Sequence, residues 1–164
     1  MAVAEPWVIN ASPIILLAKA GVMDFVLQLP QPLVIPEPVA EEVRQGAASD
    51  AGARWIHSTG KSFIQPPVGE PGHFAALDIG AGERSVIAWA MAHSEFAAIL
   101  DDQAARRQAR REGVRVLGTI GVVLRLKAAG HIERVEPCLT TIRRVGGHIS
   151  ETLFREALAH AGEI

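Results

Sequence analysis

Residues 7–14 read WVINASPI, which places an apolar triplet, one polar residue and a Ser-Pro pair next to one another. The triplet predicts a short buried strand. Ser12 is a residue type that caps helices, and Pro13 suits the first helical position, so we expect a helix over about 13–19. A strand that passes directly into a helix is the first half of a βαβ unit, because parallel strands need a long crossover connection.

The same alternation continues along the chain. Further strands are expected at 33–35, 62–64, 96–100 and 114–117. Further helices are expected at 23–29, 36–45, 83–92, 103–112, 119–129, 137–145 and 150–161, with Thr119 and Ser150 capping two of them. The small, polar segment 46–52 and the Gly- and Pro-rich segment 60–72, apart from the possible strand at 62–64, are expected to be loops. This alternation predicts an α/β fold, with a mostly parallel sheet and helices on both faces.

The composition indicates one ordinary domain over residues 1–164, since 164 residues with 49% hydrophobic content suffice for one buried core. The longest aliphatic run, residues 14–18, is too short to cross a bilayer, so we expect a soluble, cytoplasmic protein that does not bind membranes. Cys138 is the only cysteine, which excludes an intramolecular disulfide and a cysteine-rich zinc site.

Charge is segregated along the sequence although the net charge is only −2. Residues 1–102 contain 5 Lys and Arg against 12 Asp and Glu, whereas residues 103–145 contain 10 against 3. One interpretation is an acidic site with a basic flank that binds the phosphates of a polyanion. The other is an ordinary solvated helix face, and the sequence leaves both open.

Oxygen-bearing side chains recur where a strand or loop passes into a helix, the positions that an open α/β sheet gathers into one crevice. They are Asn10, Glu42, Glu83, Asp101 and Asp102, with Asp78 as a weaker candidate. Magnesium requires few protein carboxylates besides water and substrate oxygens, and carboxylates this close should raise at least one pKa when no metal is bound. Each position also has a structural alternative, such as a helix cap for one of the two adjacent aspartates.

Three neighbouring features have competing explanations as well. Ser12 is a helix cap that also suits contact with a phosphate, and Arg106 is the arginine nearest to the carboxylates. Gly80-Ala81-Gly82 is expected to let the chain turn tightly into the next helix. The apolar stripe of the last helix should pack on the core, with a partner surface as the alternative; it consists of Leu153, Phe154, Ala157 and Leu158.

With these residues placed, the chain resembles PIN domains, and in particular the small prokaryotic group related to the toxin nucleases of toxin–antitoxin pairs. The resemblance covers nearly the whole chain, and no single motif decides it. It is carried by residues 8–13, 35–43, 82–83, 100–106 and 118–122. It implies a three-layer α/β/α sandwich that cuts RNA with Mg²⁺ or Mn²⁺.

The resemblance also implies roles for the individual residues. Asn10 takes the family's first acidic position, Glu42 the second, Glu83 the third, and Asp102 with Asp101 the fourth. The implied metal ligands are Glu42, Glu83 and Asp102, and the implied substrate contacts are Ser12 and Arg106. Asn10 departs from the aspartate that most of the wider family has, and it brings no negative charge to a metal.

The implied partners are an RNA substrate, a small antitoxin protein and a second copy of the chain in a homodimer. A different class of function is a PIN-like interaction or RNA-binding module that has lost catalysis through Asn10. A phosphoacceptor or phosphatase domain is a third class. It ranks low, because such domains generally have their essential aspartates after the first strand, where this chain has asparagine.

Overall fold

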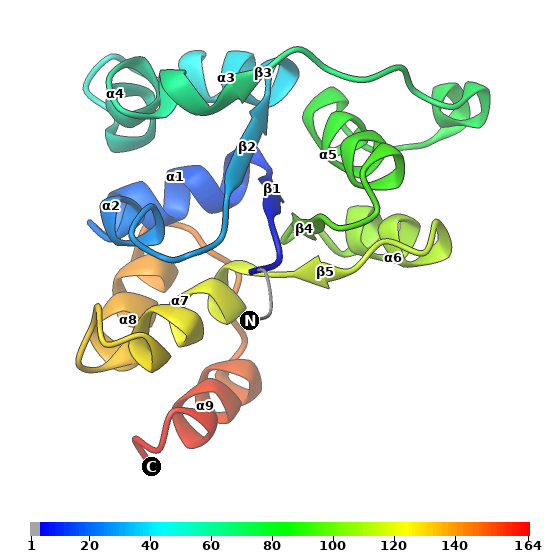
Figure 1. The fold of residues 1–164 in the computed structure, drawn as a ribbon. Helices are drawn as coiled ribbons and strands as arrows, with labels where there is room; N and C mark the ends of the chain where they lie inside the picture. Colours follow the sequence, from blue (N-terminus) through cyan, green and yellow to red (C-terminus); the bar gives the residue numbers. More distant parts are fainter. Residues whose placement is uncertain (1–3) are drawn as a thin grey trace.

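The computed structural model describes residues 4–164, and its strands and helices alternate along the chain (Figure 1). The strands are β1 (Trp7–Ile9), β2 (Leu33–Pro36), β3 (Ile64–Gln65), β4 (Ala97–Ile99) and β5 (Val116–Leu117). The α-helices are α1 (Ala11–Lys19), α2 (Met23–Val26), α3 (Glu37–Arg44), α4 (Ala51–His57), α5 (Ala81–Ala92), α6 (Gln103–Arg111), α7 (Thr119–Ala128), α8 (Val135–Arg144) and α9 (Glu151–His160). Two 3₁₀ turns are η1 (Gly60–Phe63) and η2 (Gly72–Ala76).

The five strands form one sheet in the order β3-β2-β1-β4-β5, and every pairing within residues 4–164 is parallel. From β1 the chain moves toward one edge of the sheet, and from β4 it moves toward the other. Helices α1 and α2 therefore lie on one side of the sheet and α5 and α6 on the opposite side (Figure 1). The predicted α/β sandwich with a parallel central sheet is confirmed.

The core is formed around the central strands. All three residues of β1 and all three of β4 are buried, as expected for parallel strands that helices cover on both faces. Buried side chains from the sheet and from most helices form one hydrophobic cluster. Among the described residues, no helix combines the length and the apolar character needed to cross a bilayer.

Several details differ from the sequence prediction. Helix α1 begins at Ala11, so Asn10 and not Ser12 is its N-cap, and Asn10 makes no side-chain capping bond. Similarly, Gly118 precedes α7, and Thr119 is its first residue and not its cap. Helix α4 was not predicted at all, although the Asp50 carboxylate caps it by accepting from the Gly52 backbone N–H at 2.9 Å. Ser12 and Thr119 lie inside their helices and so do not cap them, whereas Asp50 caps α4 as its residue type allows.

The last helix is attached to the domain through Glu163, whose side chain is only 5% exposed. Its carboxylate accepts hydrogen bonds from Lys127 Nζ at 2.9 Å and from the backbone N–H groups of Val135 and Glu136 at 2.7 and 3.1 Å. Burial alone raises the pKa of this carboxyl, but the hydrogen bonds from Lys127 and the two backbone groups hold the pKa below its ordinary value. Glu163 thus connects the C-terminal segment to α7 and to the first turn of α8.

Replacing Glu163 by alanine should lower the free energy of unfolding by about 1 to 3 kcal/mol, because two buried backbone donors and Lys127 lose their acceptor. The folded pKa is depressed, so this contribution is complete above the ordinary value of 4.5 and is lost as the pH falls through the folded pKa. Urea unfolding of wild type and Glu163→Ala at several pH values measures the difference. Glu156→Ala, at an exposed position of α9, is the control and should change little. A difference that does not shrink at acid pH would contradict this role.

Candidate active site

The site begins where β1 and β4 end next to each other. These strands pair with Ile9 opposite Ile99, and the Asn10 backbone N–H donates to the Ile99 carbonyl at 3.1 Å. Asn10 therefore leaves the sheet at the same edge as Asp101 and Asp102, which follow β4 two residues later. After β1 and β4 the chain continues toward opposite edges of the sheet. Open parallel sheets bind ligands at the strand ends where the connections diverge in this way.

Two helices bring Glu42 and Glu83 to the same edge. Glu42 lies in α3 and Glu83 in the first turn of α5, and these two helices pack against each other. A Cβ atom built on Gly82 would lie 2.7 Å from Glu42 Oε2 and 3.2 Å from Asn10 Oδ1. Gly82 thus leaves the space that these two oxygens occupy. The Gly80-Ala81-Gly82 segment was expected to make a tight turn, but neither glycine has a positive φ. Glycine suits position 82 because it leaves room for the two oxygens.

Glu83 is the carboxyl group most affected by its surroundings. Burial raises its pKa, and the negative charges of Asp102 and Glu42 raise it further, while the Gly80 backbone opposes the rise in part. The sequence analysis expected a raised pKa within the acidic set, and this expectation is confirmed. The arrangement holds negative charges close together and favours either a bound cation or a retained proton.

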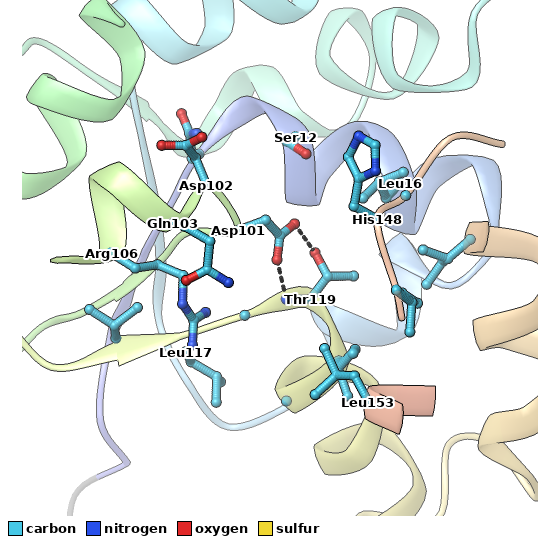
Figure 2. A pocket seen from close by; sticks show the side chains of 18 of the residues that line it. Ser12, Leu16, Asp101, Asp102, Gln103, Arg106, Leu117, Thr119, His148 and Leu153 are labelled. Carbon is cyan, nitrogen blue, oxygen red and sulfur yellow. Dashed lines mark hydrogen bonds between the residues drawn. The ribbon is translucent and has the colours of Figure 1, made fainter. Parts of the chain in front are cut away.

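Asp101 and Asp102 are adjacent in sequence but have different partners. Asp102 caps α6, accepting from the Ala105 backbone N–H at 2.9 Å, as was expected for one of the pair. Asp101 accepts from the Thr119 backbone N–H at 2.8 Å and from Thr119 Oγ1 at 2.6 Å (Figure 2). Both carboxylate oxygens of Asp101 thus bind Thr119, which fixes the start of α7 relative to the end of β4.

A pocket of about 660 Å³ opens from these carboxylates. Its lining includes Asn10, Ser12, Glu83, Asp101, Asp102, Arg106 and Arg110. Ser12 is exposed in the first turn of α1. Glu42 is not part of this lining; it approaches Asn10 from the side of Gly82. Asp78 is exposed and lies outside the pocket lining as well.

Arg106 lines the pocket together with the carboxylates. Its Nη1 donates to the Leu100 carbonyl at 2.8 Å, and a Cβ on Gly118 would come within 2.7 Å of the same nitrogen. Burial and the charge of Arg110 lower the pKa of Arg106, and Asp101 partly offsets this, although an arginine stays protonated. Among the arginines of this helix the sequence favoured Arg106; Arg110, four residues later on the same helix, lines the pocket as well.

A family model described as PIN domain matches residues 6–163. This chain belongs to the PIN domain family. PIN domains are generally nucleases and typically use divalent metals, so membership in the family supports a nuclease-like function. Searches of curated proteins and of solved structures found no match.

The oxygen atoms of this PIN domain suit a divalent metal. Asn10 Oδ1 is buried without a hydrogen-bond partner. The nearby Glu42 Oε2 is also an acceptor, so the two oxygens cannot form a hydrogen bond with each other. Both are hard oxygen ligands of the type that Mg²⁺ and Mn²⁺ bind. Within residues 4–164, no three His, Cys, Asp or Glu side chains are arranged closely enough to hold a metal by themselves. Glu42, Glu83 and Asp102, the three ligands expected from the sequence, therefore do not form a metal site by themselves, and an ion at this edge would need Asn10, water or substrate oxygens as further ligands.

Replacing Gly82 by alanine should weaken Mn²⁺ binding about tenfold while the protein still folds, since the flexible end of Glu42 can move away from the new methyl group. Isothermal titration calorimetry measures the affinity, and thermal unfolding checks the fold. Gly69→Ala is the matched control, because nothing lies within 4 Å of a Cβ at that position. An unchanged Mn²⁺ affinity in Gly82→Ala would show that the ion does not bind near Asn10 and Glu42.

Replacing Glu83 by glutamine should raise the thermal midpoint of the metal-free protein at neutral pH. The folded pKa of Glu83 lies above the ordinary value of 4.5, so its ionisation costs more in the folded state than in the unfolded state. The stabilisation from the protonated group is complete below 4.5 and is lost as the pH rises through the folded pKa. The gain in Glu83→Gln should therefore vanish in acid, and differential scanning calorimetry in EDTA measures it. Asp78→Asn, at an exposed position, is the control; a lower midpoint for Glu83→Gln at pH 7 would argue against mutual repulsion.

Proposed function

We propose that this PIN domain is a metal-dependent endoribonuclease that hydrolyses RNA phosphodiester bonds with Mg²⁺ or Mn²⁺. One observation carries the proposal: Glu83 lies close enough to Glu42 and Asp102 for their charges to raise its pKa, beside a buried Asn10 oxygen that has no partner. Such a cluster is costly in the absence of a cation. Membership in a family of nucleases agrees with this chemistry.

Each residue then has a distinct role. Asn10, Glu42, Glu83 and Asp102 would hold the metal, which activates water and neutralises charge on the phosphate when bound. Arg106 and Arg110 would bind the phosphates that flank the reacting one, and Ser12 would contact a phosphate oxygen from the exposed first turn of α1.

Two carboxyl groups have further assignments. Without the metal, the raised pKa lets Glu83 keep a proton to a higher pH than an ordinary glutamate, so binding of a dication would release that proton and make Glu83 a ligand. We assign Asp101 a positioning role beside the catalytic set, because both of its oxygens bind Thr119. Its loss would shift the start of α7, and with it one wall of the pocket.

We extend the proposal to the partners of this activity. RNA is the substrate, a small antitoxin protein covers the acidic crevice, and two copies of the chain form a homodimer. The pocket supports the first of these, because it combines carboxylates for a metal with arginines for phosphates.

A second function, an RNA-binding or interaction module without catalysis, is favoured by one observation. Asn10 brings an amide and no charge to the first position after β1, which lowers the attraction for a dication. In that case the pocket would still bind RNA through Arg106 and Arg110 but would not cut it. Cleavage by the purified protein separates the two functions.

The purified protein should cleave single-stranded RNA in Mn²⁺, and EDTA should stop the reaction. Asp102→Asn should reduce the rate at least a hundredfold, because the charge is lost while asparagine still caps α6 and preserves the fold. Gel analysis of a labelled RNA measures the rate, and thermal unfolding checks the variant. Asp78→Asn is the control and should cleave like wild type. Binding of RNA without any cleavage would leave only the interaction module, and full activity in Asp102→Asn would assign the cleavage to another site or to a contaminant.

A further inference from the structure

The pocket has a second half that the proposed chemistry does not use. Its lining includes apolar side chains that we call together the apolar subsite, namely Leu16, Ile120, Ile142, Ile149 and Leu153, and it also includes His148. Figure 2 shows Asp102 and Arg106 on one side of the pocket and His148, Leu16 and Leu153 on the other, with the Asp101–Thr119 pair between them. The two halves form one continuous cavity.

The chain segment that carries His148 has a fixed conformation. Just after the end of α8 the chain turns at Gly146, which has a φ of +106°, and the Gly147 backbone N–H donates to the Ile142 carbonyl at 2.9 Å. A Cβ on Gly147 would come within 2.5 Å of Ile142 Cγ2 and 2.9 Å of its carbonyl oxygen, so only glycine fits there without a shift. The two glycines therefore determine where His148 leaves the end of α8.

The other wall of the subsite is fixed by the start of α9. Ser150 caps this helix by accepting from the Leu153 backbone N–H at 3.1 Å, and Arg143 lies over the Phe154 ring at 4.5 Å. Leu153 is nevertheless 42% exposed, one of two large hydrophobic side chains with this much exposure among residues 4–164. A firmly placed apolar side chain that stays open to solvent inside a pocket is suited to contact a ligand.

The expected core packing of the last helix is thus realised only in part. Ala157 and Leu158 are buried, whereas Leu153 faces the pocket and is exposed. The reason is that α9 makes its main contacts with α8, so only one edge of its apolar stripe reaches the core.

We propose that the apolar subsite binds one unpaired base of the RNA strand whose phosphates lie against Arg106 and Arg110. The base would lie among Leu16, Ile149 and Leu153, and the His148 imidazole would stack on it or contact its edge. Proteins recognise single-stranded RNA in this way, with unstacked bases placed on aromatic or apolar side chains. The inference rests on the proposed function, since it takes RNA as the ligand.

Charge and continuity favour this occupant over a protein segment. The pocket lining also includes Arg106 and Arg110, which suits the phosphates on either side of a bound base. The subsite also opens directly into the carboxylate half, so a strand that fills both halves places a phosphate near the acidic residues. The subsite would thereby restrict the substrate to nucleic acid in which a base is free to leave its stack.

The test compares two probes that have the same phosphates. A fluorescein-labelled adenosine hexaribonucleotide and an abasic hexamer with the same sugar-phosphate backbone are titrated with the protein in EDTA, and anisotropy gives both Kd values. Wild type should bind the adenosine hexamer about tenfold more tightly, which corresponds to about 1.4 kcal/mol. The double variant His148→Ala/Leu153→Ala should lose this preference while its affinity for the abasic hexamer stays within about twofold.

The matched control is His160→Ala/Ile164→Ala, which removes an exposed histidine and the other exposed large hydrophobic side chain at positions outside the pocket. It should keep the full preference for adenosine. Equal binding of both hexamers by wild type, or a preference that survives in His148→Ala/Leu153→Ala, overturns the base subsite.

The measurement in EDTA does not depend on cleavage, so the two proposals fail separately. A preference for adenosine that depends on His148 and Leu153, in a protein that never cuts RNA, would keep the subsite and overturn the nuclease. Cleavage that requires Asp102, with no preference between the hexamers, would keep the nuclease and overturn the subsite.

Discussion

The pairing of β1 with β4 is the constraint on which the rest of the structure depends. The two strands are far apart in sequence, and their register sets Ile9 opposite Ile99, so the polar residues that follow them leave the sheet at one place. Because the chain then continues to opposite sides of the sheet, a crevice opens at the ends of this pair. Asn10 borders this crevice at the end of β1, and Asp101 and Asp102 border it at the end of β4.

Packing next to the crevice depends on three glycines, which have no side chain. Gly82 leaves room for oxygens of Asn10 and Glu42, Gly118 leaves room for Arg106, and Gly147 lets the chain pass close to Ile142. The three glycines lie on three different segments. At each of them a neighbouring group occupies the space that the methyl group of an alanine would fill. Close packing makes such spaces specific, because an interior without voids cannot shift easily to accept an added atom.

Asp101 connects the two halves of the pocket. Its bonds to Thr119 join the end of β4 to the start of α7, so the acidic half and the apolar half share one rigid wall. Asp102 meanwhile caps α6 and so fixes the helix that presents Arg106 and Arg110. The two adjacent aspartates therefore have different structural roles. Arg106 lies on one side of the Asp101–Thr119 pair and the proposed base subsite on the other.

The sequence by itself determined the class of fold and the positions of the polar residues. Strand β1, the alternation of strands with helices and the helix ends near Gly113 and Gly162 follow from local patterns, since periodicity and capping act over a few residues. It also indicated that Asn10 and Asp102 would leave the sheet at the same edge, because they follow neighbouring parallel strands. Only the tertiary structure decided that Asp102 and not Asp101 caps a helix, that Glu83 has the raised pKa, and that His148 and Leu153 belong to the same pocket. These properties depend on distances between segments that are remote in sequence, and no local pattern contains those distances.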